Sequence, residues 1–129
     1  MKKHVVRKPT DAELAILRVL WEHGPLTVRE VHGHLLADQN VGYTTTLKIL
    51  QIMTDKGFVV RDEKERAHIY TARESEQATQ GRLLRHLIDR AFGGSRAKLV
   101  MQALATEEAD PGELNEIRRL IDQMVEADQ

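Results

Sequence analysis

The chain has 129 residues, a formal net charge of −1 and no cysteine. This length allows one modest hydrophobic core, or a small domain with an extension that needs a partner. The absence of cysteine excludes disulfides and thiolate metal sites. No apolar run approaches the roughly 20 residues that span a bilayer, and residues 1–8 lack the apolar core of a signal peptide. We therefore expect a cytoplasmic protein without a membrane partner.

Charge is distributed unevenly along the chain. Residues 1–73 contain 12 Lys and Arg against 9 Asp and Glu, whereas residues 74–129 contain 7 against 11. The first part therefore carries +3 and the second −4. Because phosphate binding requires a basic surface, any nucleic-acid contact is expected in the first part.

Two helices are expected in the first forty residues. Thr10 or Asp11 can cap a helix that ends at Gly24-Pro25. Residues 27–30, Thr-Val-Arg-Glu, form a capping box that opens a second helix, which ends near residue 37 and is followed by a turn over 38–42. The inward faces are predicted to consist of Leu14, Leu17, Leu20 and Trp21 in the first helix and Val28, Val31 and Leu35 in the second.

A third helix is predicted from about Thr44 to Gly57, a residue that can adopt the left-handed conformation beyond a helix end. The spacing of Leu47, Leu50 and Met53 predicts its buried stripe. Tyr43 and Phe58 are expected to close the two ends of that stripe as core residues. The side chains left facing outward are Thr44, Thr45, Lys48, Gln51 and Asp55.

A basic β-hairpin follows the third helix. Residues 58–60 and 69–70 are predicted strands, and they flank a charged stretch, 61–68. The side chains that can hold phosphates there are Arg61, Lys64, Arg66 and His68. A helix with a polar outer face followed by a basic hairpin is typical of a winged helix-turn-helix, in which the helix enters the major groove and the wing touches the backbone.

Three amphipathic helices are predicted in the second part, beginning near residues 74, 96 and 111. Gly93-Gly94 separates the first two, Ser95 can cap the second, and Pro111 suits the first position of the third. An intramolecular core is the alternative, but 56 residues are too few to cover all these apolar faces. We expect a dimerisation region, 74–129, beside a DNA-binding domain, 1–73. The predicted interface consists of Leu83, Leu84, Leu87, Ile88, Phe92, Leu114, Ile117, Leu120, Ile121 and Met124.

No catalytic, cofactor or metal site is predicted. His32 and His34 are two residues apart and face different directions on a helix, and the chain has no His-x-x-x-His pair. It also lacks the Gly-x-Ser-x-Gly, P-loop and Gly-x-Gly-x-x-Gly motifs. An enzyme is therefore the least supported class of function.

The chain resembles the penicillinase-repressor family of bacterial transcription regulators, which includes the methicillin-resistance repressors and copper-responsive relatives. The similar segments lie in order along nearly the whole chain. They are Pro9–Leu14 with Leu20-Trp21, Leu26–Val31, Tyr43–Thr45 with Lys56-Gly57, His68–Tyr70, and Phe92–Ser95 with Leu99-Val100. The resemblance implies a homodimer whose winged-helix domains bind a palindromic operator in double-stranded DNA.

The resemblance also implies a regulatory protease as a partner, because some members are cut at an Asn-Phe bond in the helix after Gly-Gly-Ser. Here the nearest residues are Gln102-Ala103. Copper-responsive members use C-terminal cysteines, which this chain lacks. A position that is often basic or polar in the family is Ile52, whose side chain could meet a thymine methyl.

We therefore expect a mainly α protein with a small β-hairpin that works as a dimeric repressor. Thr44, Thr45, Lys48 and Gln51 would enter the major groove, and Arg61, Lys64, Arg66 and His68 would hold the backbone or minor groove. The alternative is a winged-helix protein-interaction module that uses the same hairpin on an acidic partner. Steep salt dependence with sequence selectivity would favour DNA.

Overall fold

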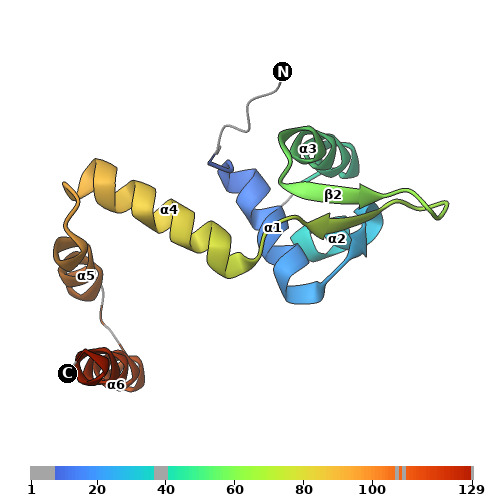
Figure 1. The fold of residues 1–129 in the computed structure, drawn as a ribbon. Helices are drawn as coiled ribbons and strands as arrows, with labels where there is room; N and C mark the ends of the chain where they lie inside the picture. The colour runs from blue at the N-terminus through green and yellow to red at the C-terminus, as the bar shows by residue number, and fades with distance from the viewer. Residues whose placement is uncertain (1–7, 37–40, 107, 109, 129) are drawn as a thin grey trace. The chain divides into compact units, whose positions relative to one another are not determined.

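The computed structural model describes residues 8–36, 41–106, 108 and 110–128. Residues 1–7, from the N-terminal segment that lacks the apolar core of a signal peptide, and most of the predicted turn 38–42 lie outside the described residues. Contacts divide the chain into two compact units, Met1–Leu84 and Arg85–Gln129. The order of elements is α1 (Asp11–His23), β1 (Leu26–Thr27), α2 (Val28–Leu36), α3 (Tyr43–Lys56), β2 (Val59–Asp62), β3 (Ile69–Ala72), α4 (Glu76–Ala91), α5 (Arg96–Ala105) and α6 (Pro111–Ala127) (Figure 1).

Capping boxes start the first two helices. The Glu13 amide donates to Thr10 Oγ1 at 3.2 Å, and the Thr10 amide donates to Glu13 Oε1 at 2.9 Å. The same exchange joins Thr27 and Glu30 at the start of α2. Each box satisfies amides that a helix end would otherwise leave without partners. The box predicted for Thr27 and Glu30 is confirmed, and of the two residues considered for α1 the cap is Thr10.

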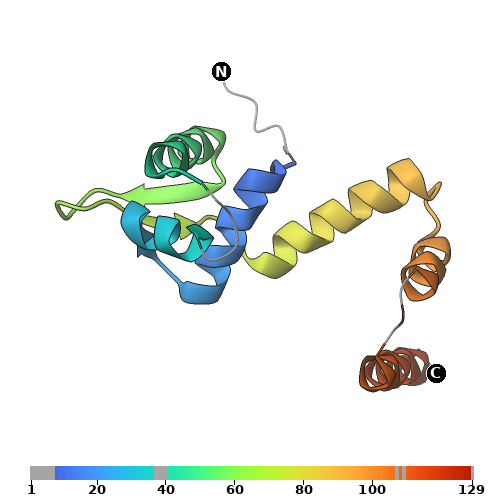
Figure 2. The same cartoon turned by 180° about the vertical axis from the view of Figure 1, so that it is seen from behind.

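The β-structure is larger than the predicted hairpin. A third strand, β1, pairs antiparallel with β3 through Leu26 opposite Tyr70, so the strand order is β1-β3-β2. The prediction of two strands was incomplete, because β1 has two residues and is too short to show an alternating pattern. The loop between β2 and β3 projects away from α1, α2 and α3 in both views (Figures 1 and 2).

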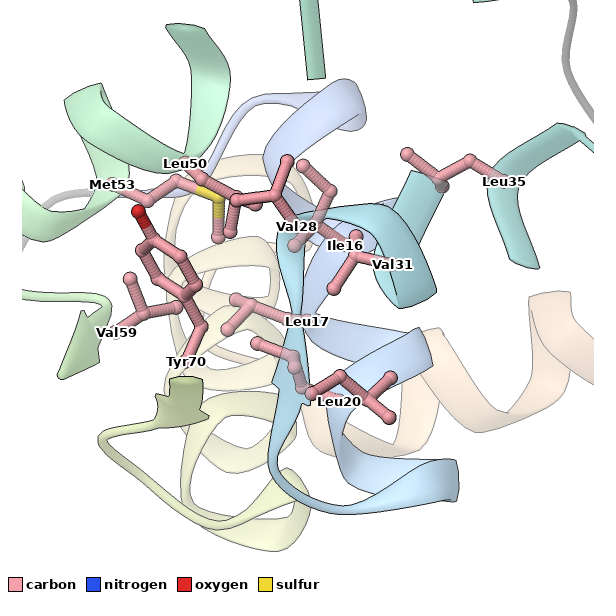
Figure 3. Packing of buried hydrophobic residues seen from close by; sticks show 11 residues of the cluster. Ile16, Leu17, Leu20, Val28, Val31, Leu35, Leu50, Met53, Val59 and Tyr70 are labelled. Atoms are coloured by element: carbon pink, nitrogen blue, oxygen red, sulfur yellow. The ribbon is translucent and has the colours of Figure 1, made fainter. Parts of the chain in front are cut away.

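One hydrophobic core holds the first unit together. Side chains from α1, α2, α3 and all three strands converge in it (Figure 3). Leu50 and Met53 of α3 and Tyr70 of β3 are among its most buried members. Their burial fixes helix α3 against the sheet. The complete buried cluster is Ile16, Leu17, Leu20, Leu26, Val28, Val31, Leu35, Leu50, Met53, Val59 and Tyr70.

The helices of the second part begin and end largely where local signals place them. α4 begins at Glu76 rather than near Glu74, because the Ser75 hydroxyl accepts from the Ala78 amide at 3.1 Å and caps it. Gly93 and Gly94 have φ of 55° and 81°, which glycine adopts without strain. Ser95 caps α5 through the Lys98 amide, as predicted. Among the described residues, no helix has the length and apolar character needed to cross a membrane.

These elements confirm the predicted architecture. The first unit is a winged helix-turn-helix in which α2 and α3 are the two helices and the β2–β3 hairpin is the wing. The remaining chain is helical, with no strand among its described residues.

Candidate nucleic-acid interface

The outer face of α3 is a continuous polar stripe. Thr44, Lys48, Gln51 and Asp55 follow one another at spacings of four, three and four residues, which places them on one side of an α-helix. All four are exposed, as is Thr45 beside them. Ile52 extends this surface with a side chain that is 40% exposed. The predicted outward orientation of the polar residues is therefore confirmed.

A buried hydrogen bond supports the first turn of α3. The Thr46 side chain is fully buried, and its hydroxyl donates to the Gly42 carbonyl at 3.4 Å. Nδ1 of His32, from α2, lies 3.1 Å from Thr46 Oγ1. The two helices are thus linked next to the residues that begin the polar stripe.

Tyr43 corrects one expectation. It was predicted to be a core residue, but its side chain is 44% exposed and its ring meets His32 edge to face, with ring centroids 5.5 Å apart. Thr46 occupies the inward position of this turn instead, because it lies four residues before the buried Leu50 and a helix places residues four apart on the same side. Phe58, at the other end of α3, does pack against the core as predicted.

An ion pair anchors the C-terminal end of α3. Lys56 Nζ lies 2.8 Å from Oε2 of Glu13, a residue that is only 3% exposed. Burial opposes ionisation of the Glu13 carboxyl, but hydrogen bonds from Lys56 and the Thr10 amide outweigh it and hold the pKa below its ordinary value. Gly57 then ends α3 in the left-handed conformation, with φ of 85°.

The wing presents its basic residues in different ways. Arg61 is half-buried on β2, and its Nη2 lies 2.8 Å from Glu63 Oε1, so part of its charge is already compensated. The Lys64 amide donates to Asp62 Oδ1 at 2.9 Å and shapes the loop, while the Lys64 side chain is exposed. Arg66 and His68 are also exposed.

A groove of about 400 Å³ lies between the wing and α3. Of the predicted contact residues, it brings together Arg66 and His68. Its lining also includes Arg29 and Tyr43, which sequence reasoning did not assign to a site. Both residues reach the groove only through contacts made in the folded chain, so no local signal in the sequence marks them. The full lining is Thr27, Val28, Arg29, Tyr43, Leu47, Arg66, Ala67, His68 and Tyr70.

The predicted dimer residues are incompletely covered within one chain. Leu84, Leu87, Leu114, Leu120, Ile121 and Met124 are exposed. Leu83, Ile88, Phe92 and Ile117 are half-buried. The large apolar side chains Val100, Met101 and Leu104 of α5 are exposed as well. None of the residues named here is buried to the degree of the winged-helix core.

Three histidines of the first two helices contact neighbouring side chains. The rings of His23 and His34 stack with centroids 3.8 Å apart, while His32 contacts Thr46 and Tyr43. His32 and His34 therefore face different directions, as predicted. Within the described part of the chain, no three His, Asp or Glu side chains are grouped as a metal site would require.

Comparison with known proteins gives related sequences. The family model described as penicillinase repressor matches residues 9–123. A protein of Mycobacterium tuberculosis named transcriptional regulator BlaI is 30% identical over 120 residues, covering 79% of this chain and 86% of that protein. The penicillinase repressor of Bacillus licheniformis is 23% identical over 123 residues, covering 95% of this chain and 94% of that protein.

A solved structure is also similar. The solution structure of the DNA binding domain of the repressor BlaI matches with a TM-score of 0.51 and 28% identity, covering 59% of this chain and 90% of that domain. The match of the family model extends over most of the chain, through both the winged-helix unit and most of the C-terminal helices. The chain belongs to the penicillinase repressor family.

Proposed function

We propose that this protein is a transcriptional repressor that binds a palindromic operator in double-stranded DNA as a homodimer. The observation that carries the proposal is the exposed polar stripe of α3, fixed against a core and placed next to a basic wing. An α-helix fits the major groove, where polar side chains can distinguish all four base pairs. The names of the relatives, which are transcriptional regulators and repressors, support this assignment.

The residues of the interface have separable roles in the proposal. Thr44, Thr45, Lys48 and Gln51 enter the major groove and meet base edges or nearby phosphates. Lys64, Arg66 and His68 contact the backbone from the wing. Arg61 contributes less than these, because Glu63 shares its charge. Repression then follows from occupation of promoter DNA.

The C-terminal helices supply the second half of the proposal. Their apolar faces are exposed within one chain, and burying them against a second copy would remove this surface from water. A twofold dimer presents two copies of α3 to two half-sites, which explains why the expected operator is a palindrome. The bound dimer thus gains affinity from both half-sites.

The direct test is selection of bound sequences from a pool of random DNA duplexes. We expect one palindromic sequence to be enriched, with binding that weakens steeply as salt is raised. The Lys48→Ala variant should bind that sequence more weakly, while Lys98→Ala, which removes the same charge from α5, should not. Selection of no sequence, together with salt-insensitive binding to an acidic protein, would reject the proposal in favour of a protein-interaction module.

Release from DNA is the part of the proposal in which this chain departs from the cleaved members of its family. Gln102 and Ala103 lie in α5, and both side chains are exposed. A protease that recognises Asn-Phe needs an aromatic side chain to fill its pocket, and Ala103 offers a methyl group. We therefore propose that a different signal, or a protease of different specificity, releases the repressor.

A further inference from the structure

The groove between α3 and the wing is the cavity that the proposed roles leave unexplained. Three separate segments form it: the start of α2, the first turns of α3, and the end of the wing loop with β3. It lies entirely within the winged-helix unit. Its shape is therefore set by the same core that fixes α3.

The lining of this groove combines an apolar surface with positive charge. Val28, Leu47 and Tyr70 contribute apolar atoms, and Tyr43 contributes an exposed ring. Arg29, Arg66 and His68 supply cationic or proton-donating groups, and none of the described lining residues is acidic. Such a lining is complementary to a ligand with both an apolar ring and an anionic group.

Positive charge in this groove comes from side chains, because the backbone amides of Thr27 and Glu30 at the start of α2 already have partners. At the start of α2 the Thr27 hydroxyl and the Glu30 carboxylate already bond each other's backbone amides. Arg29, by contrast, is exposed and forms no ion pair with any residue in 8–36 or 41–106. Its guanidinium group is thus available for a phosphate, which it can bind through two parallel hydrogen bonds.

The position of the groove identifies the occupant. A helix in a major groove and a wing at the neighbouring minor groove are separated by one sugar-phosphate strand of the duplex. The groove lies between α3 and the wing, where that strand must pass. Each nucleotide of the strand carries an apolar deoxyribose face and a charged phosphate, which match the two parts of the lining.

We propose that this groove holds one strand of the DNA backbone, with Arg29 and Arg66 on a phosphate and Tyr43 against the adjoining deoxyribose. The inference rests on the proposed function and adds α2 to the DNA-contacting elements. Arg29 is then a backbone contact that sets the register of α3 without reading a base. Tyr43 acts as a packing surface for the sugar.

The first experiment measures operator affinity of the full-length protein against salt concentration. Arg29→Ala should weaken binding roughly tenfold and lower the salt slope by about 0.9 for each arginine lost, hence about 1.8 for a dimer. Arg18→Ala, which removes an exposed arginine of α1 that does not line the groove, is the matched control and should change neither quantity. Thermal melting of both variants should match the wild type.

The second experiment replaces single operator phosphates by neutral methylphosphonates. At one position in each half-site, the substitution should weaken the wild type but have little further effect on Arg29→Ala, because both changes remove the same contact. Additive losses at every position, or an unchanged salt slope in Arg29→Ala, would overturn the inference. So would a changed base preference of Arg29→Ala in the duplex selection, because Arg29 would then read a base.

Failure of this inference is distinguishable from failure of the proposed function. If the wild type selects a palindrome but Arg29→Ala behaves like Arg18→Ala, the groove assignment is wrong and the repressor assignment stands. If the wild type selects no DNA, the proposed function itself fails. Tyr43→Leu, which keeps an apolar side chain, separates the sugar contact from the phosphate contact because it should weaken binding without altering the salt slope.

Discussion

The two units of this protein are built from similar helices but differ in what those helices bury. The winged-helix unit encloses a cluster of 11 apolar residues that includes Leu50, a side chain with 0% exposure. Residues 85–106, 108 and 110–128 bury no side chain, and Leu120 is 57% exposed. Both units have strongly amphipathic helices, so amphipathic periodicity shows which face of a helix is apolar and leaves open what covers it.

The difference comes from the number of elements that meet around one centre. In the winged-helix unit, three helices and a three-stranded sheet surround Tyr70 and its neighbours, so each apolar face finds a partner in the same chain (Figure 3). In the second unit, α5 and α6 bury no residue. The first unit should therefore be stable at any concentration, and the second should depend on association.

The largest effect is expected from a charge on the apolar face of α6. Leu120→Asp should abolish self-association, because a buried unpaired carboxylate costs several kcal/mol. Arg119→Asp, on the opposite side of the helix, is the matched control and should leave the dimer intact. Sedimentation measures the oligomeric state of both variants. A Leu120→Asp protein that sediments as the wild-type dimer would contradict the proposed interface and remove the contrast between the units.

Truncation of core side chains should reproduce the same contrast in stability. Leu50→Ala should lower the free energy of unfolding of the winged-helix unit by about 2–5 kcal/mol, because it leaves a cavity in a packed core. Leu104→Ala, at an exposed position of α5, should change the unfolding of that unit by less than about 0.5 kcal/mol. Denaturant titrations followed by a probe in the first unit measure both. Equal losses would show that the units unfold together.

An intermediate effect is expected from the ion pair that anchors α3. Lys56→Met should cost about 1–3 kcal/mol, because it leaves the buried Glu13 carboxylate without its cation, although Lys56 itself is partly exposed. Lys64→Met, in the exposed wing loop, should be nearly neutral. The Glu13→Gln, Lys56→Met double variant should recover part of the loss. Thermal unfolding of the wild type, Glu13→Gln, Lys56→Met and the double variant completes the cycle, and a neutral Lys56→Met would exclude the anchoring role.

A smaller effect on the stability of the winged-helix unit is expected from acid. The pKa of Glu13 is held below its ordinary value in the folded protein, so the stability that its charge contributes is present at neutral pH and above the ordinary carboxyl range. It is lost as the pH falls through that lowered pKa. Glu13→Gln should therefore flatten the acid limb of a plot of stability against pH. An identical acid limb in the variant would show that Glu13 does not contribute.

No effect is expected from a protease that cuts the Asn-Phe bond of other family members. A sensor protease that cuts Asn-Phe should leave this chain intact, because Ala103 lacks the aromatic side chain such a pocket requires. Gln102→Asn together with Ala103→Phe should create a cleavable bond in α5. Gel analysis after incubation of both proteins with such a protease provides the test. A wild-type fragment that ends at Gln102 would disprove the prediction.

Much of the fold was predictable from local chemistry. Three helices are capped by the hydroxyls of Thr10, Thr27 and Ser95. Each of these residues stands just before a helix, and its hydroxyl accepts a hydrogen bond from the backbone amide three residues later. Gly57 ends α3 for an equally local reason. The spacing of Leu50 and Met53 marks the inner face of α3. The polar residues that remain on the helix were therefore predicted to face outward.

What could not be predicted depends on contacts between residues distant in sequence. β1 exists because Leu26 pairs with Tyr70 on β3, and two residues carry no pattern of their own. Tyr43 was wrongly predicted to be a core residue. The buried side chain in that turn is Thr46, a small polar residue that contacts His32 of α2. Arg29 and Arg66 line one groove that only the folded sheet and helices create.

The single tryptophan of the chain has a position that experiments can use. Trp21, near the end of α1, packs against the core and donates its indole N–H to the Glu74 carbonyl at 3.0 Å. Its ultraviolet fluorescence therefore reports on the closure of the winged-helix unit and on the segment that leads into α4. Because α5 and α6 contain no second indole, an emission spectrum follows one unit without a label, while light scattering follows the association of the other.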